Sequence, residues 1–247
     1  MNKTADNKIK IGSLISGGGT NLQAILDACA ENRIDADMLF TGSDNKDAKG
    51  LKRAEKAHVK TFIVDYPAII KNLKKKPDSA ELPDDFILEK IKVKQKLFSK
   101  DTPSEKIDFF LKSRAIAEKE LLDHIIPYNI DLLVLAGFMR TMTPYFIDRF
   151  CNTPAHPKIM NIHPALLPSF PGTDGYGDTF RYGCKIGGCT VHFIDYGEDT
   201  GPIIGQKAFS IDDTDTLDDI KRKGLELEWQ LFPECIQKFA ESMDNKA

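Results

Sequence analysis

The N-terminal part of the chain alternates short apolar runs with amphipathic segments. Residues 9–15 form an apolar run that predicts a buried strand, and helical spacing begins at residue 21. Residues 37–41 and 60–64 predict two further strands, with a helix over 49–57 between them. The order strand, helix, strand, helix, strand is typical of an α/β fold with an open, mostly parallel, doubly wound sheet.

A lysine-rich segment, residues 67–112, interrupts this alternation and is broken by prolines. We expect a polar, helical insertion within a single domain that spans residues 1–247, with short helices near 86–97 and 106–111. Residues 91–96 also alternate as in an exposed edge strand. The charge run favours a solvated face over a binding patch.

The C-terminal half returns to regular elements. Helical spacing over 114–128 precedes an apolar strand at 131–136. The remaining predicted elements are strands at 159–163, 190–194 and 203–209, and one long helix or a pair interrupted near Pro233 over 216–240.

The segment KIMNIHPALLPSFPG, residues 158–172, contains the most distinctive polar pair. Because successive strand side chains point to opposite faces, Asn161 and His163 leave the strand on the same face. The prolines that follow prevent a central strand or helix interior and predict a stiff loop. Such a pair can supply a proton and hydrogen bonds to a reacting carbonyl. A core histidine with Asn161 capping a turn is the alternative, and this segment alone leaves both open.

A glycine-rich turn, SGGGTN, joins the first strand to its helix. Gly18 and Gly19 allow positive φ and close backbone approach, and the helix N-terminus favours an anion. Thr20 and Asn21 add side-chain donors. The turn has neither GxGxxG nor GK[ST] spacing, so it does not favour a dinucleotide or ATP. An anion site is favoured over a tight connection that merely needs glycine.

Two later loops carry candidate chemistry. Residues 139–142 follow a strand at the sheet edge where open α/β folds place ligands. A turn after the strand at 190–194 contains Asp195, Glu198 and Asp199. Acids are also common in turns for conformational reasons, so this density alone does not establish catalysis.

Composition and charge exclude several classes of protein. With 41% hydrophobic and 29% charged residues the 247-residue chain is globular, and its net charge of −3 gives no drive towards nucleic acid or an anionic membrane. Five scattered cysteines without CxxC spacing indicate reduced thiols rather than a disulfide framework or metal site. The polar N-terminus lacks an apolar signal core, and no segment has the length of a membrane span. We expect a cytoplasmic protein.

Taken together, several segments resemble the phosphoribosylglycinamide formyltransferase family of folate-dependent enzymes. They are SGGGTNLQAI, LLVLAGFMR, NIHPALLPSFPG, VHFIDYGEDTGPII and Glu228 ahead of Phe232-Pro233. The resemblance covers the chain apart from residues 67–112 and implies a Rossmann-like formyltransferase fold. It also implies formyl transfer from the co-substrate 10-formyltetrahydrofolate to the amine of glycinamide ribonucleotide, in purine biosynthesis, without a metal.

The resemblance assigns roles to matched residues. The implied catalytic residues are Asn161, His163 and Asp199. The implied phosphate- and ribose-binding residues are Gly18, Gly19, Thr20, Asn21 and Glu228. The implied folate-binding residues are Arg114, Met139, Arg140, Thr141, Met142, Asn161 and Asp195. His192 matches a supporting histidine. Asp199 near His163 is expected to raise the pKa of that ring and favour its cation.

One loop departs from the pattern, and other activities compete. Residues 173–187, TDGYGDTFRYGCKIG, replace a stretch that often has histidines and an arginine in the family, which leaves substrate contacts in this loop open. The insertion could cover the folate side, mediate assembly such as a homodimer, or be inert. A formyltetrahydrofolate hydrolase, a methionyl-tRNA formyltransferase and a non-catalytic phosphate-metabolite binder are the alternatives. The tRNA enzyme should carry a basic surface and an RNA-binding domain, neither of which is evident. A pure binder has no need for the three catalytic residues.

Overall fold

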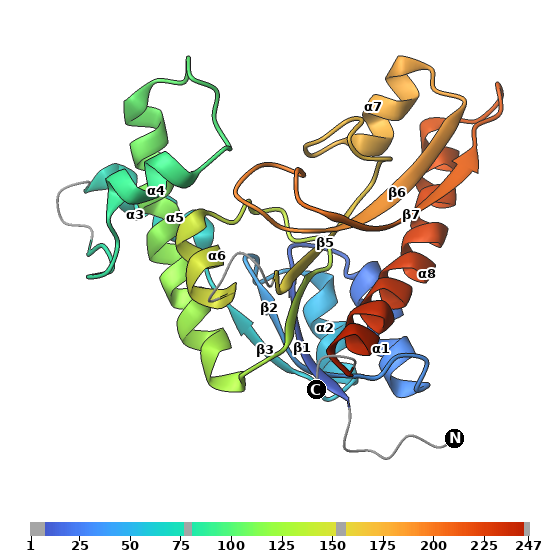
Figure 1. The fold of residues 1–247 in the computed structure, drawn as a ribbon, viewed down its shortest axis with the longest axis horizontal. Helices are drawn as coiled ribbons and strands as arrows, with labels where there is room; N and C mark the ends of the chain where they lie inside the picture. Colours follow the sequence, from blue (N-terminus) through green and yellow to red (C-terminus); the bar gives the residue numbers. More distant parts are fainter. Residues whose placement is uncertain (1–7, 77–80, 152–156, 245–247) are drawn as a thin grey trace.

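The computed structural model describes residues 8–76, 81–151 and 157–244. Residues 1–7 of the polar N-terminus and residues 77–80 of the predicted insertion lie outside the described residues. Within the described part, one sheet has the strand order β3-β2-β1-β4-β5-β6-β7 (Figure 1). Strands β1 to β5 pair in parallel, whereas β6 is antiparallel to both β5 and β7. The open, mostly parallel, doubly wound sheet predicted from the sequence is confirmed.

The element bounds follow the sequence pattern closely in the sheet. The strands are β1 Ile9–Ile15, β2 Ala36–Ser43, β3 Lys60–Ile63, β4 Leu132–Leu135, β5 Ile159–His163, β6 Ile186–Phe193 and β7 Ile203–Ser210. The helices are α1 Thr20–Ala30, α2 Lys49–Lys56, α3 Tyr66–Lys75, α4 Leu88–Lys94, α5 Ser104–Ile125, the short 3₁₀ helix Ile126–Tyr128, α6 Pro144–Cys151, α7 Gly175–Tyr182 and α8 Leu217–Asp244.

Alternating side chains of the central strands divide the core into two layers. Leu132 and Val134 of β4 pack in the cluster formed with α1, α2 and α8. Leu133 and Leu135 of the same strand pack in the other cluster, with α3, α4, α5 and α6. Figure 1 shows α1 and α8 on one side of the sheet and α3 to α6 on the other. A parallel strand covered on both faces is apolar at every position, which explains the continuous apolar run of β4.

Two predictions for the helical regions are wrong, and the alternative left open for the C-terminal helix is decided. The separate helices expected near 106–111 and 114–128 are one helix, α5. The edge-strand alternative for residues 91–96 is wrong because α4 runs through Lys94. Helix α8 continues through Pro233, since the buried residues on both sides of it, Phe232 and Cys235, hold the helix against the sheet. The helix α7 has no counterpart among the predicted elements.

The loops after β1 and β4 meet where the direction of strand order reverses. The chain leaves β1 for β2 and β3 on one side and returns to β4 on the other. Ser16 N–H donates to Gly137 O at 3.0 Å, and Met139 N–H donates to Ser16 Oγ at 2.8 Å. These bonds join the glycine-rich turn to the 139–142 loop, at the position where open α/β sheets bind ligands.

A buried carboxylate fixes the far end of the 139–142 loop. Glu118 on α5 is fully buried and accepts from Thr143 N–H at 2.7 Å and from the Thr143 hydroxyl at 2.5 Å. The Thr143 carbonyl in turn accepts from Phe146 N–H and Ile147 N–H at the start of α6. Burial raises the pKa of Glu118 to about 7, against the hydrogen bonds from Thr143.

Glu118→Gln is expected to remove a component of the pH dependence of stability. A carboxyl whose pKa is raised from 4.5 in the unfolded chain to about 7 in the fold stabilises the fold below pH 4.5 and loses that contribution as the pH rises through 7. Between pH 4.5 and 8 the variant should therefore gain about 3 kcal/mol of unfolding free energy relative to the wild type. Urea unfolding at several pH values measures this, with Glu120→Gln, exposed on the same helix, as control. If the unfolding free energies of Glu118→Gln and the wild type change with pH in parallel, Glu118 does not have a raised pKa in the fold.

Candidate active site

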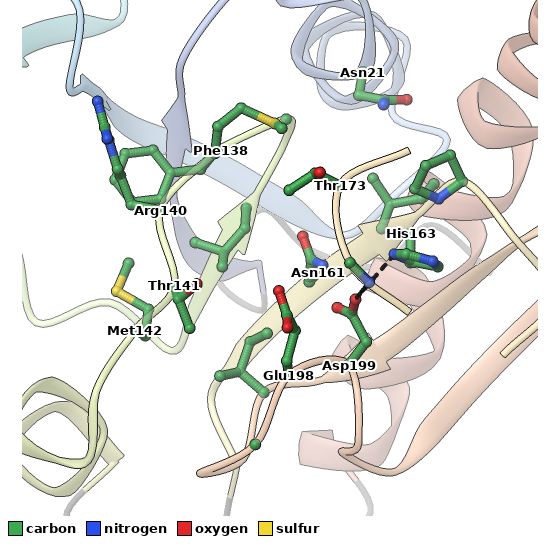
Figure 2. Close-up of a pocket in the computed structure, with 18 of the residues that line it drawn as sticks. Asn21, Phe138, Arg140, Thr141, Met142, Asn161, His163, Thr173, Glu198 and Asp199 are labelled. Atoms are coloured by element: carbon green, nitrogen blue, oxygen red, sulfur yellow. Dashed lines mark hydrogen bonds and ion pairs between the residues drawn. The ribbon is translucent and has the colours of Figure 1, made fainter. Parts of the chain in front are cut away.

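A pocket lies at the edge of the sheet where the loops after β4 and β5 meet the turn after β6. Figure 2 shows Asn161, His163 and Asp199 between Asn21 on one side and the 140–142 loop on the other. The predicted site residues that line it are Asn21, Met139, Arg140, Thr141, Met142, Asn161, His163, Asp199 and Glu228. Residues from α1, β5 and α8, distant from one another in the chain, are thereby brought together.

The ring of His163 is buried between two acceptors. Its Nε2 lies 2.8 Å from Phe170 O, and its Nδ1 lies 3.3 Å from Asp199 Oδ2. A neutral imidazole has only one N–H, so it can satisfy only one of these contacts. Only the doubly protonated ring satisfies both, so these two contacts favour the imidazolium, in opposition to burial.

The two partners of His163 both have left-handed backbone conformations. Phe170 has φ 53° and Asp199 has φ 54°, values that residues other than glycine adopt at a cost of about 1–3 kcal/mol. Asp199 is held there by Gly172 N–H, which donates to its Oδ2 at 2.8 Å. Backbone strain that converges on one side chain is typical of a functional site rather than of core packing.

The balance of pKa shifts differs from the sequence-based expectation. Burial lowers the pKa of His163, and the opposing effects of Asp199 and the Phe170 carbonyl do not reverse this. Asp199 acts on the pKa in the expected upward direction, but desolvation outweighs the carboxylate, so the net shift does not favour the cation in the free protein. Burial acts to raise the pKa of Asp199, but hydrogen bonds from His192 and Gly172 N–H together with nearby His163 lower it overall. The Asp199 carboxylate, with its pKa lowered, thus faces a ring whose pKa lies below the ordinary histidine value.

His192 supports the pair from the neighbouring strand. The antiparallel register places Asn161 opposite His192. His192 Nε2 lies 3.3 Å from Asn161 Nδ2 and 3.5 Å from Asp199 Oδ1, while its Nδ1 lies 2.9 Å from Phe193 O. This fully buried ring therefore contacts two of the three predicted catalytic residues, in the supporting position expected for it.

Asn21 and Glu228 close one end of the pocket. Asn21 Nδ2 donates to Glu228 Oε2 at 2.6 Å, which joins the start of α1 to the middle of α8. Asn21 Oδ1 is buried and has no partner among the described residues. Burial raises the pKa of Glu228, although the donors Asn21 and Tyr176 act in the opposite direction. This end therefore has one unpaired oxygen acceptor, Asn21 Oδ1, beside a carboxylate with further lone pairs.

Two arginines lie over the ring of one tyrosine. One of them, Arg140, belongs to the 139–142 loop, which lines the pocket on the side away from Asn21. Arg140 and Arg114 have their guanidinium carbons 5.4 Å and 5.1 Å from the centre of the Tyr66 ring. Arg140 also forms an ion pair with the buried Asp44. Arg114 is buried, and its Nε and Nη1 have no hydrogen-bond partner among the described residues. Burial lowers the pKa of Arg114.

Several predicted site residues lie outside the pocket lining. Arg114 lies over the Tyr66 ring, as described above. Gly18, Gly19 and Thr20 form the turn at the start of α1. Gly19 has φ 69°, and a Cβ at this position would lie 2.6 Å from Gly50 Cα, so no larger residue fits there. Asp195 accepts from Gly197 N–H and the Thr200 hydroxyl at 3.0 and 2.6 Å. Asp195 therefore organises the turn that carries Asp199.

The sequence reasoning missed Phe170, Tyr176 and Glu118. The first provides the carbonyl for His163, the second donates to Glu228 at 2.6 Å, and the third holds the 139–142 loop. Their roles depend on partners distant in the chain or on backbone atoms, so no local pattern reveals them. Tyr176 falls in the 173–187 segment, whose departure from the family was the only available signal.

The described residues contain no group of three or more His, Cys, Asp or Glu placed to hold a metal ion. Among the helices described, none combines the length and apolar character needed to cross a membrane.

Comparison with known proteins identifies the family. The formyl transferase family model matches residues 9–236. The chain belongs to this family. It is 31% identical to the phosphoribosylglycinamide formyltransferase of Bacillus subtilis (strain 168), over 93% of both chains. It is 30% identical to the Escherichia coli (strain K12) protein of the same name, over 92% of this chain and 85% of the relative.

Solved structures of the family have the same architecture. Glycinamide ribonucleotide transformylase 1 from Symbiobacterium toebii matches with a TM-score of 0.72 and 35% identity, over 96% of this chain and 90% of that one. Phosphoribosylglycinamide formyltransferase from Brucella melitensis matches with a TM-score of 0.68 and 29% identity, over 94% and 96%. The resemblance to phosphoribosylglycinamide formyltransferases seen in the motifs is thereby confirmed, as is the Rossmann-like fold.

His163 is expected to titrate below the ordinary histidine range, and further below it in Asp199→Asn. The second shift follows because the variant loses the carboxylate that favours the imidazolium. Ring-proton NMR titration of both proteins measures this, with His163→Gln used to assign the resonance. A His163 pKa that is unchanged or higher in Asp199→Asn would show that the two side chains are not coupled.

Proposed function

We propose that this protein transfers the formyl group of 10-formyltetrahydrofolate to the amine of glycinamide ribonucleotide, a step of purine biosynthesis. The observation that carries the proposal is the convergence of Asn161, His163 and Asp199 between two chemically different ends of one pocket. The names of the relatives point to the same reaction. The five cysteines are free thiols, which agrees with a reducing cytoplasmic location.

The ribonucleotide occupies the end formed by α1 and α8 in this proposal. Gly18, Gly19 and Thr20 present the N-terminus of α1 to the phosphate, since backbone N–H groups and the helix dipole favour an anion there. Glu228 and the unpartnered Asn21 Oδ1 accept hydrogen bonds from ribose hydroxyls. The substrate amine is then directed towards Asn161 and His163.

The folate occupies the other end. The loop of Met139, Arg140, Thr141 and Met142 forms one wall for the pterin, and the turn that Asp195 organises forms the opposite wall. Arg140 and Arg114 provide positive charge for the carboxylates of the folate tail. The unpartnered Nε and Nη1 of Arg114 support this role, because a buried guanidinium without acceptors is costly unless a ligand provides them.

The chemistry follows from the three converging side chains. The amine nitrogen forms a bond to the formyl carbon, whose oxygen becomes an oxyanion. Asn161 Nδ2 donates to this oxyanion, and so does His163, with the oxyanion replacing Phe170 O as acceptor for Nε2–H. Negative charge developing beside the ring raises its proton affinity, so the ring takes up at Nδ1 the proton that Asp199 receives from the attacking amine, and the imidazolium forms as the reaction proceeds.

Asp199 completes the transfer of the proton. Its ionised carboxylate, 3.3 Å from His163 Nδ1, accepts the amine proton directly or through water. The bond between the formyl carbon and the folate nitrogen then breaks, and the imidazolium returns the proton, through Asp199 or water, to that nitrogen. The products are the formylated ribonucleotide and tetrahydrofolate.

The direct test is an absorbance assay of folate deformylation with and without glycinamide ribonucleotide. Signal that depends on the ribonucleotide is expected. Equal deformylation in its absence would assign a formyltetrahydrofolate hydrolase instead, and no signal in either case would favour a non-catalytic binding protein.

Asp199→Asn is expected to lower kcat about 10²–10⁴-fold, because the amide cannot accept the amine proton or support the imidazolium. Steady-state kinetics measures the loss, and circular dichroism checks that the fold is retained. Asp213→Asn, exposed on the surface, serves as the matched control. Near-normal turnover of Asp199→Asn would exclude this residue from catalysis.

Arg114→Met is expected to raise the KM for the formyl-folate about tenfold, the effect of losing hydrogen bonds to a charged group. The stability of the variant should fall by no more than about 1 kcal/mol, since methionine fills a similar volume and removes a buried charge with unpaired donors. Kinetics and thermal unfolding separate the two effects. A large loss of stability with unchanged KM would make Arg114 a structural residue.

A further inference from the structure

Glu228 is fixed by donors from two other elements. Tyr176 OH on α7 donates to Glu228 Oε1 at 2.6 Å, and Asn21 Nδ2 on α1 donates to Oε2 at 2.6 Å. All three side chains are at least nine-tenths buried. Each carboxylate oxygen therefore has one defined protein donor, and the carboxylate plane is held in a single orientation.

The chain around Tyr176 is shaped to bring its hydroxyl to this position. Gly224, one turn before Glu228 on α8, faces the tyrosine, and a Cβ at residue 224 would lie 2.1 Å from Tyr176 Cζ. On the other side, a Cβ at residue 175 would lie 2.6 Å from Pro164 O. Tyr176 thus inserts against α8 only because neighbouring positions are glycine. This close approach links the loop after His163 to the middle of α8.

The contact has a consequence for Asn21. Because Asn21 Nδ2 donates to Glu228, its Oδ1 is directed elsewhere, and this buried atom has no partner among the described residues. The remaining lone pairs of Glu228 are acceptors as well. Asn21 Oδ1 and the remaining lone pairs of Glu228 therefore offer acceptors at this end of the pocket, which suit a ligand with several donors such as the vicinal hydroxyls of a ribose.

We propose that Tyr176 is the positioning residue that orients Glu228, and through it Asn21, for recognition of the vicinal diol of the ribonucleotide. This inference rests on the proposed function and names a residue in the segment that departs from the family. Tyr176 acts by holding the acceptors rather than by touching the reacting atoms. The site accordingly discriminates a ribonucleotide from its 2′-deoxy analogue, which leaves one buried acceptor unpaired.

Tyr176 also affects the pKa of Glu228. Burial raises the pKa of this carboxyl, and the hydrogen bonds from Asn21 and Tyr176 oppose the rise. The other titratable group that interacts with it is the buried Cys189 on β6. Loss of the Tyr176 donor therefore raises the pKa of Glu228 further, and protonation would turn an acceptor into a donor.

The test compares Tyr176→Phe with the wild type in steady-state formyl transfer. The variant should raise the KM for glycinamide ribonucleotide about tenfold, with kcat and the KM for formyl-folate nearly unchanged, because a hydrogen bond to a charged group is lost at the ribose end only. Its preference for the ribonucleotide over the 2′-deoxy analogue should weaken by a similar factor. At low pH, protonation of Glu228 should raise the KM for the ribonucleotide. In the variant this rise should begin at a higher pH than in the wild type, because the Tyr176 donor that lowers the pKa of Glu228 is lost.

Two further variants complete the experiment. Gly224→Ala, which crowds the tyrosine from the α8 side, should reproduce the KM effect. Tyr128→Phe, in the other hydrophobic layer, should behave as the wild type. If the wild type transfers formyl groups and Tyr176→Phe retains its KM, sugar preference and pH profile, the inference fails while the proposed function stands. A wild type that does not formylate the ribonucleotide would instead overturn the proposed function.

Discussion

The contact between His163 and Asp199 is the constraint on which the rest of the site depends. It joins the end of a parallel strand to a turn on the antiparallel side of the sheet, and both partners of the ring have left-handed backbone conformations. Burial and a facing carboxylate act on the ring in opposite directions, and burial prevails in the free protein. A ring in this state can gain a proton as negative charge develops beside it, which is the behaviour that formyl transfer requires.

The fold makes this contact possible because loops that follow parallel strands and a turn that follows the antiparallel strand β6 meet at one edge of the sheet. The reversal of strand order brings the loops after β1 and β4 together, and bonds between Ser16 and residues 137 and 139 hold them there. The antiparallel strand β6 then returns a turn over the same edge, with His192 opposite Asn161. Thus the loops of the parallel strands form one part of the pocket, and the antiparallel part brings Asp199 to it.

Sequence patterns predicted most of the strands, because a strand that is buried on both faces is a continuous apolar run in the sequence. The bounds of β1 and β5 match the apolar runs, and the side-chain alternation correctly placed Asn161 and His163 together. Helix α7 was missed because its glycine-rich start has low helical propensity, and it is held by the insertion of Tyr176 against α8. The upward effect of Asp199 on the pKa of His163 was predicted, but the larger opposing effect of burial was not, since desolvation depends on tertiary packing, which no motif reports. The contact of Asn21 with Glu228 spans 207 positions and has no local signal either.

The central claim is that one pocket holds both reactants with the formyl carbon between Asn161 and His163. A crystal structure of the protein with glycinamide ribonucleotide and a non-reactive analogue of 10-formyltetrahydrofolate tests it most directly. We expect the phosphate at the N-terminus of α1, the ribose hydroxyls on Glu228, the pterin between residues 139–142 and 195–199, and the analogue's carbonyl oxygen within hydrogen-bond distance of Asn161. Reactants bound in the opposite orientation, or a carbonyl distant from Asn161 and His163, would contradict the account.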